Sequence, residues 1–268
     1  MIKYLLLLLI FPGMGLSMQE KGVTVFHEQL PDKSIRIFAK NITEVPQSVK
    51  IEGTIKGMES SESLPMVLLV APGETKYAFS LTPEKGTSYS YNYKYTYIQG
   101  DVTAVHNDDH VYRLPFRKGE SYLVGQGYNE RPTHMNQYAV DFNMDEGTSV
   151  CAIRDGVVMQ AVDNNSKGCP KEECTQFNNF ILVRHEDGSI ADYSHLKKRG
   201  AMVSIGQEVK AGQPIGLSGS TGWASGPHLH LEVYVMRFSG QQSVKVEYHL
   251  DKNTIGIPRS MQSYTQEL

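Results

Sequence analysis

The amino-acid sequence predicts a mainly β protein with two domains. Short runs of β-branched and aromatic residues recur along the chain, separated by glycine, proline and other turn residues. Between residues 89 and 97, tyrosine alternates strictly with other residues, which is the period of a strand. Long amphipathic helical patterns are missing. With 268 residues and 40% apolar content, the chain can bury two cores of ordinary size.

Residues 1–17 have the three parts of a secretory signal. Lys3 precedes an apolar run at residues 4–11, and a break at Pro12-Gly13 leads to the small residue Ser17. The run is far shorter than the ~20 apolar residues that span a bilayer. A buried first strand is the alternative interpretation. We expect an exported protein, periplasmic or secreted, without a stable membrane span after removal of the signal.

Residues 22–115 are predicted to form an N-terminal immunoglobulin-like β-sandwich. Short β-type runs separated by turn residues are typical of such a domain. These runs are residues 23–26, 34–39, 49–55, 66–70 and 77–81. The sequence does not identify a protein partner for this domain.

A row of five tyrosines follows these runs. The rings share one face of a strand, because side chains two residues apart point the same way. They are Tyr89, Tyr91, Tyr93, Tyr95 and Tyr97. Two interpretations are open: a face turned toward the core of the sandwich, which we favour, and a platform that stacks on glycans.

The predicted domain boundary lies in the Leu-Pro-Phe-Arg-Lys-Gly segment at residues 114–119. Residues 116–268 then form a second domain, for which short strands bounded by glycine predict an antiparallel β-sheet. The formal net charge of -3 provides no basic field of the kind that displaces phosphate counterions. We therefore do not expect nucleic acid as a partner.

Three cysteines are compatible with an oxidising compartment. Cys169 and Cys174 bracket the polar segment Pro-Lys-Glu-Glu, and we predict a local disulfide between them. Cys151 lies in an apolar run and is interpreted as a small buried side chain.

His228 and His230 form the most informative pair in the second domain. They alternate with leucine in a strand-like run, so both project from one face about 7 Å apart along the chain. Such a pair can share one site, with one imidazole on a metal ion and the other beside a bound water or substrate. Half-buried strands also carry histidines for purely structural reasons.

Three further residues are candidates. Asp141 lies inside an apolar run, where a carboxylate is costly unless it is paired or binds a cation, and a buried salt bridge is the alternative. His134 falls in a polar loop, where a histidine needs no special explanation. His195 ends a strand-like stretch and is a candidate base or a surface histidine.

Together these segments resemble the lysostaphin-type (LytM-type) zinc endopeptidases. The resemblance includes residues 134–141, Tyr193-Ser194-His195-Leu196 and the Gly-Pro-His-Leu-His-Leu-Glu-Val segment at residues 226–233. Glycine-containing segments at residues 147–158 and 206–216 match as well, so order and spacing hold over roughly residues 120–235. The first half resembles two-domain bacterial members more loosely.

The resemblance implies that His134, Asp141 and His230 hold Zn²⁺, while His195 and His228 stand beside a metal-activated water. Two imidazoles and a carboxylate leave a fourth position open, as in catalytic zinc sites. The family's substrate is peptidoglycan, so the implied function is a zinc metalloendopeptidase that hydrolyses peptide crosslinks between peptidoglycan stems. The sequence does not indicate which bond is cleaved.

The sequence departs from the family pattern at one point, and two other functions compete with the endopeptidase interpretation. Six residues separate His134 from Asp141, whereas the family commonly has three. Some members of the family are catalytically silent, bind peptidoglycan and activate an amidase. Such members typically lack ligands or catalytic histidines, and all five positions are filled here. The other rival is a glycan-binding module that uses the tyrosine face.

Overall fold

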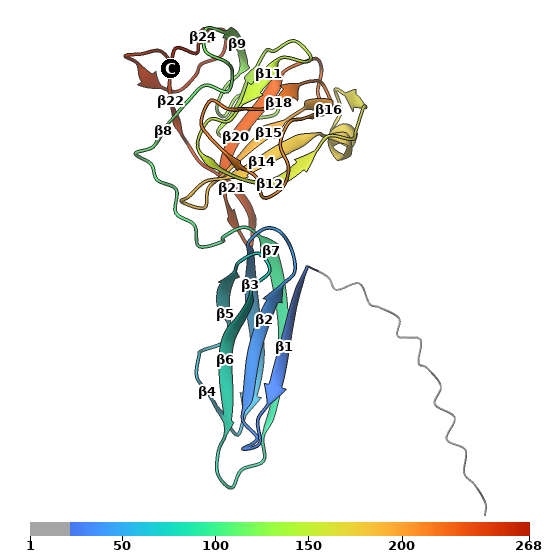
Figure 1. Ribbon diagram of the computed structural model, residues 1–268, viewed down its shortest axis with the longest axis vertical. Helices are drawn as coiled ribbons and strands as arrows, with labels where there is room; N and C mark the ends of the chain where they lie inside the picture. Colours follow the sequence, from blue (N-terminus) through green and yellow to red (C-terminus); the bar gives the residue numbers. More distant parts are fainter. Residues whose placement is uncertain (1–21) are drawn as a thin grey trace, which may run out of the picture.

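A computed structural model describes residues 22–268 of the chain (Figure 1). The described chain is almost entirely β, with one short 3-10 helix, η1 (Glu172–Phe177). The predicted mainly β class is therefore confirmed. The predicted signal at residues 1–17 lies outside the described residues. No helix of residues 22–268 is long and apolar enough to cross a membrane.

The N-terminal lobe is a sandwich of two sheets, drawn in blue to teal in Figure 1. One sheet has the order β1-β2-β6-β4 and the other the order β5-β3-β7. The strands are β1 (Val23–Gln29), β2 (Ile35–Asn41), β3 (Gln47–Lys56), β4 (Met58–Ser60), β5 (Met66–Val70), β6 (Thr75–Pro83) and β7 (Ser90–Gln99). All pairs within these sheets are antiparallel. An immunoglobulin-like topology stays a prediction.

Alternating side chains from both sheets form the core of this lobe. Ile37 of β2 and Ile51 of β3 are fully buried in the same apolar cluster. Of the tyrosine row, four rings pack partly buried against this cluster, namely Tyr89, Tyr91, Tyr93 and Tyr95. Tyr97 is 39% exposed. The rings thus pack on the core at its margin, with one edge in solvent.

The C-terminal lobe is built on a nine-stranded sheet. Its order is β17-β12-β14-β15-β20-β10-β9-β24, with β21 paired to β20, and every pair is antiparallel. The strands are β9 (Ser121–Gln126), β10 (Ala139–Phe142), β12 (Gly156–Val162), β14 (Phe180–Arg184), β15 (Ile190–Ser194), β17 (Glu208–Val209), β20 (Leu229–Arg237), β21 (Gly240–Ser243) and β24 (Ser263–Thr265).

Smaller sheets complete this lobe. One has the order β11-β18-β16, and another has the order β23-β22-β8. A two-stranded parallel ladder joins β13 to β19. Their bounds are β8 (Val111–Tyr112), β11 (Ser149–Cys151), β13 (Gly168–Cys169), β16 (Leu196–Ala201), β18 (Pro214–Ser218), β19 (Gly222–Trp223), β22 (Glu247–His249) and β23 (Ile255–Gly256).

Strand β20 separates the core from the polar face of the large sheet. Leu229, Leu231 and Val233 are fully buried in the main apolar cluster of this lobe. Because side chains alternate along a strand, His230 and Glu232 project from the opposite face. The hydrophobic effect that fixes the leucines inward therefore also fixes the direction of the polar residues.

The two lobes are joined by residues 100–110 and by a small apolar contact. Val45 of the first lobe is clustered with Met159, Ile190 and Tyr234 of the second. The Arg237 guanidinium at the end of β20 donates hydrogen bonds to the carbonyl oxygens of Val102 and Ala104, at 3.0 and 2.9 Å. The end of β20 is thus tied to the connecting segment.

Candidate metal centre

Strand register brings two of the predicted ligands together. In the antiparallel pairing of β10 with β20, Asp141 lies opposite His230. His230 Nδ1 is 2.9 Å from Asp141 Oδ1. The long-range contact follows from pairing two short apolar runs, each of which carries one polar residue on the same face.

His134 reaches the same carboxylate from the loop between β9 and β10. Its backbone nitrogen donates to the carbonyl of Glu130, and its own carbonyl accepts from Gln137, so the loop folds as two consecutive turns. The side chain is 1% exposed, and Nε2 lies 3.2 Å from Asp141 Oδ1. These turns accommodate the six residues between His134 and Asp141.

The proton positions of these residues favour a cation at their centre. His134 Nδ1 is 3.0 Å from the carbonyl oxygen of Gly127, and a carbonyl can only accept, so Nδ1 carries the proton. In the neutral ring, Nε2 then presents a lone pair toward the Asp141 carboxylate, and this buried atom has no hydrogen-bond partner in the described chain. The ligand atoms of His134, Asp141 and His230 all lie within 4.8 Å of one another. The residues therefore fit a bound divalent cation.

The pKa shifts of the centre also favour a bound positive charge. Burial by itself raises the pKa of Asp141, but its close contacts with the His134 and His230 rings lower it well below its usual range. Burial lowers the pKa of His230, whereas the hydrogen bond and charge of Asp141 raise it to about 9. The cluster thus accepts a positive charge at neutral pH, either as a proton or as a metal ion.

His195 and His228 lie beside this centre. Their ring centroids are 4.6 Å apart, and those of His195 and His230 are 5.8 Å apart. His195 Nδ1 donates to the carbonyl of Thr221 at 2.8 Å, and His228 Nδ1 to the carbonyl of Gly226 at 2.9 Å. When the rings are neutral, both Nε2 atoms are therefore left as acceptors. Burial, followed by the charges of His228 and His230, lowers the pKa of His195 to about 3, so its ring is neutral near pH 7.

The backbone around His195 is held by a neighbouring loop. His195 has a φ of 66°, in the left-handed region that is costly for a residue with a side chain. Its N–H donates to Asn178 Oδ1 at 2.9 Å, while Asn178 Nδ2 donates to Ser194 Oγ at 2.8 Å. Asn178 therefore satisfies the polar groups exposed by this unusual turn.

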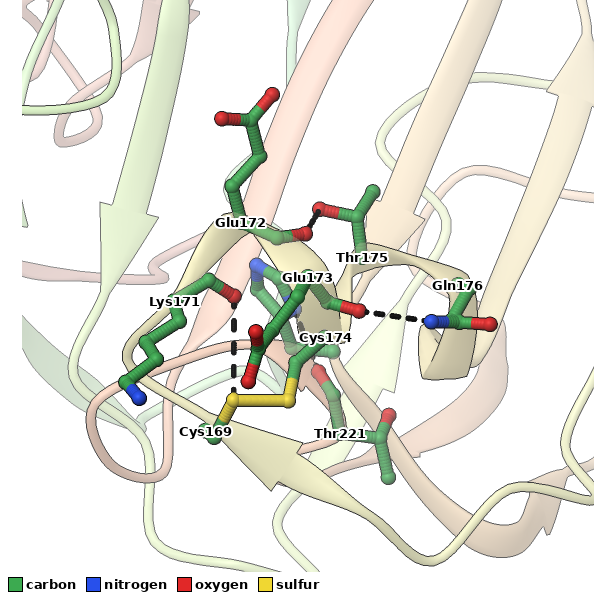
Figure 2. Close-up of a disulfide and its surroundings, with 9 residues drawn as sticks. Cys169, Lys171, Glu172, Glu173, Cys174, Thr175, Gln176 and Thr221 are labelled. Atoms are coloured by element: carbon green, nitrogen blue, oxygen red, sulfur yellow. Dashed lines mark hydrogen bonds between the residues drawn. A yellow bond between two sulfur atoms is a disulfide. The ribbon is translucent and has the colours of Figure 1, made fainter.

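The loop that carries Asn178 contains a disulfide between Cys169 and Cys174 (Figure 2). Cys169 lies in β13 and is paired with Trp223 of β19, and Cys174 lies in η1. The predicted pair is thus covalently joined at the rim of the candidate site. Cys151 is free and buried in β11.

A cavity of about 300 Å³ contains all five predicted site residues. His134, Asp141, His195, His228 and His230 all line it. Thr175 and Trp223 contribute from the disulfide loop and β19. The arrangement places three candidate metal-ligand side chains and two further imidazoles around one cavity.

Four residues of the site escaped the sequence interpretation. Asn178 and Thr221 position His195, and Asp192 and Glu232 line the cavity. Burial raises the pKa of Asp192 to about 6. A usable signal existed for Glu232, because it continues the alternation of His228, which directly precedes β20, and His230.

The C-terminal lobe is thus a mainly β unit with a candidate metal centre. Residues 135–245 match the profile of Peptidase family M23, beginning directly after His134. This part of the chain belongs to that family, in its lysostaphin/LytM-type branch.

Curated relatives share this segment. Lysostaphin of Staphylococcus simulans is 38% identical over 122 residues, and the glycyl-glycine endopeptidase ALE-1 of Staphylococcus capitis is 39% identical over 122 residues. The peptidoglycan DD-endopeptidase ShyC of Vibrio cholerae is 40% identical over 129 residues. The matches cover 44%, 44% and 46% of this chain but only 23%, 31% and 26% of the respective relatives.

Two solved structures complete the comparison. Lysostaphin from Staphylococcus simulans aligns with a TM-score of 0.37 and 39% identity over 46% of this chain and 47% of that chain. A putative peptidase M23 from Pseudomonas aeruginosa aligns with a TM-score of 0.35 and 16% identity over 83% of this chain and 90% of that chain.

Proposed function

We propose that the protein is a zinc-dependent endopeptidase that hydrolyses peptide crosslinks of bacterial peptidoglycan. The observation that carries this proposal is the meeting of His134, Asp141 and His230 in one cavity with two imidazoles whose Nε2 atoms are free to accept. The names of the relatives support the substrate class, because they describe endopeptidases of peptidoglycan and of glycyl-glycine bonds.

The metal would be held by His134 Nε2, Asp141 and His230 Nδ1. Two nitrogen donors and one carboxylate oxygen are a donor set that suits zinc in catalytic sites. When bound, zinc supplies Lewis-acid chemistry, polarising a carbonyl oxygen and lowering the pKa of water toward ~7.

The histidines beside the metal ligands are proposed as the proton-transfer groups. His195 and His228 are held by Thr221 and Gly226 in the tautomer that leaves Nε2 unprotonated. A neutral imidazole in this orientation can accept the proton of the attacking water and return it to the departing amine. Once protonated, the same groups stabilise the negative charge that develops on the carbonyl oxygen.

The remaining parts of the chain fit an exported wall enzyme. We propose a sandwich domain at residues 22–115 and a peptidase domain at residues 116–268, preceded by a signal at residues 1–17. In this arrangement the protein is periplasmic or secreted, where a disulfide between Cys169 and Cys174 is stable. The sandwich would then position the peptidase domain on its polymeric substrate.

Digestion of purified sacculi tests the proposal. The protein is incubated with sacculi with and without a zinc chelator, and released fragments are identified by mass spectrometry. We expect chelator-sensitive loss of crosslinked dimers, and the masses identify the cleaved bond. A folded, zinc-loaded protein that releases nothing, yet increases digestion by an added amidase, would support the activator alternative.

A further inference from the structure

Two carboxylates lie in the cavity in addition to the candidate metal ligand Asp141. Asp192 belongs to β15 and Glu232 to β20, and the antiparallel register makes them direct partners. Directly opposed residues have Cβ atoms about 5 Å apart, and like charges in this position are destabilising. The fold thus holds two acidic groups together on the floor of the cavity.

Neither carboxylate forms an ion pair with a lysine or arginine of the described chain, and His230 is the nearby group whose positive charge acts on both. Glu232 is 7% exposed, and its carboxylate makes no hydrogen bond or ion pair with any residue of 22–268. Asp192 accepts one hydrogen bond, from Ser194 Oγ at 2.7 Å. Lysine and arginine are absent from the described residues that line the cavity. Two largely buried acidic side chains without a lysine or arginine partner are costly, so a ligand with positive charge would stabilise them.

The donors favour an ammonium group over a second metal ion. Asp192, Glu232 and Ser194 offer oxygen atoms at three places, which match the three N–H donors of a primary ammonium. Among the described residues, the only group of three or more side chains that meets the distances for a metal ion is His134, Asp141 and His230. A charged amine therefore fits the chemistry of this part of the cavity.

We propose that Asp192 and Glu232 form a subsite for a primary ammonium group of the peptide substrate. The inference rests on the proposed peptidase function and makes it more specific. Glu232 follows the candidate ligand His230 by two residues on the same strand face, about 7 Å along the chain. A peptide whose free amine occupies this subsite would thus be held with a neighbouring amide at the metal centre.

Binding can be measured without hydrolysis, because Trp223 is the only tryptophan of the chain and lines the same cavity. The zinc-loaded full chain is titrated with the peptide amide Ala-Lys-Ala and with its Nε-acetylated form, and tryptophan fluorescence is recorded. We expect the acetylated peptide to bind about tenfold more weakly, because it lacks the charge-assisted hydrogen bonds.

Variants assign the preference to the two carboxylates. The double variant Asp192→Asn/Glu232→Gln should bind both peptides with equal affinity and keep the zinc content of the wild type. The control variant Glu172→Gln removes an exposed carboxylate of η1 that lies outside the cavity lining, and it should keep the preference. The single variants Asp192→Asn and Glu232→Gln replace the double variant if circular dichroism shows that the latter is unfolded.

Three outcomes would overturn the subsite. These are equal binding of both peptides by the wild type, a preference that survives in a folded variant without the carboxylates, and a second equivalent of zinc that the variant lacks. The last outcome would assign the carboxylates to a metal. Preferential amine binding without cleavage of any sacculus would instead keep the subsite and reject the endopeptidase function.

Discussion

At the scale of single residues, the centre depends on which ring nitrogen of each histidine is engaged. His230 directs Nδ1 toward Asp141, whereas His228 directs Nδ1 toward the carbonyl of Gly226. The two residues are neighbours on one strand face, but only His230 contributes to the group that fits a cation. Their substitution should therefore have different consequences.

We predict that His230→Ala loses both zinc and activity, while His228→Ala retains zinc and loses activity. Removing one of three ligands weakens metal binding, whereas removing a proton-transfer group lowers kcat by roughly 10² to 10⁴-fold. Zinc content by atomic absorption and turnover on muropeptide dimers separate the two effects. Equal loss of zinc in both variants would contradict the assigned roles.

His185, far from the metal ligands in sequence, gives a pH dependence of stability. It is 1% exposed, and its Nδ1 donates to the carbonyl of Asp155 at 2.9 Å. Burial lowers its pKa to about 4 from an ordinary value of 6.5. His110, Arg154 and Asp187 are the charged and titratable groups around it.

We predict that the wild type loses about 3 kcal/mol of unfolding free energy between pH 6.5 and pH 4 through His185. The folded-state pKa is depressed, so the unfolded chain binds a proton in this window and the folded chain does not. Stability is therefore present above pH 6.5 and falls as the pH decreases.

Urea unfolding of wild type and His185→Gln at several pH values, both with chelator, checks this. The glutamine amide can keep a donor for Asp155, and the difference between the curves isolates the titration of His185. If the unfolding free energies of wild type and variant change in parallel between pH 6.5 and pH 4, the pH dependence does not come from His185.

At the scale of elements, the disulfide loop and the tyrosine strand each support a neighbouring structure. The loop carries Asn178, which holds the backbone of His195, and its cysteines lie five residues apart. The tyrosine strand β7 covers one margin of the sandwich core.

We predict that Cys169→Ser/Cys174→Ser reduces activity while zinc content is retained. Without the disulfide, the unfolded chain gains conformational entropy, which lowers the unfolding free energy by about 2 kcal/mol at room temperature. The freed loop also holds Asn178 less firmly. Thermal unfolding and turnover are measured with and without reductant. The wild type should respond to reductant and the variant should not, and unchanged turnover in the variant would exclude a role in positioning.

We predict that Tyr91→Ser/Tyr93→Ser lowers the unfolding free energy of the sandwich by about 2 kcal/mol or more, because both rings pack on its core. Tyr97→Ser, at a 39% exposed ring, is the matched control and should cost much less. Denaturant unfolding measures stability, and co-sedimentation with sacculi measures wall binding. Lost wall binding with unchanged stability would favour the glycan-platform interpretation.

At the scale of the whole molecule, the connecting segment packs with the second lobe. Tyr112 and Leu114 fall within residues 22–115, which are predicted to form the sandwich, yet both are fully buried in the core of the C-terminal lobe. His106 Nε2 is 3.0 Å from the Tyr112 hydroxyl, and Arg154 donates to that hydroxyl at 3.2 Å. The core of the C-terminal lobe thus includes residues that precede residue 116.

We predict that a fragment starting at residue 106 folds and binds zinc, whereas one starting at residue 116 is destabilised by more than about 4 kcal/mol. The shorter fragment leaves cavities where two large core side chains belong. Thermal unfolding and zinc content of both fragments test this. If the two fragments are equally stable, the peptidase domain begins at residue 116, as the sequence predicts.

The sequence indicates the strand-borne part of the site better than the loop-borne part. The alternation of histidine with leucine predicts that His228 and His230 share a face, because a period of two has one structural meaning. By contrast, Asn178 acts through a loop closed by tertiary contacts, and no local pattern reports such contacts. His134 is an intermediate case, since its turns are local but their direction depends on the packing of β9 against β10.

One strand connects the two halves of the molecule mechanically. β20 begins beside the candidate ligand His230 and ends at Arg237, whose guanidinium donates hydrogen bonds to the connecting segment. Its Tyr234 belongs to the same apolar cluster as Val45 of the sandwich. The span from His230 to Arg237 is about 23 Å of extended chain. If the sandwich is anchored to a polymer under tension, the pull would reach the metal ligands along this strand. Wall strain and the geometry of the centre would then be directly coupled.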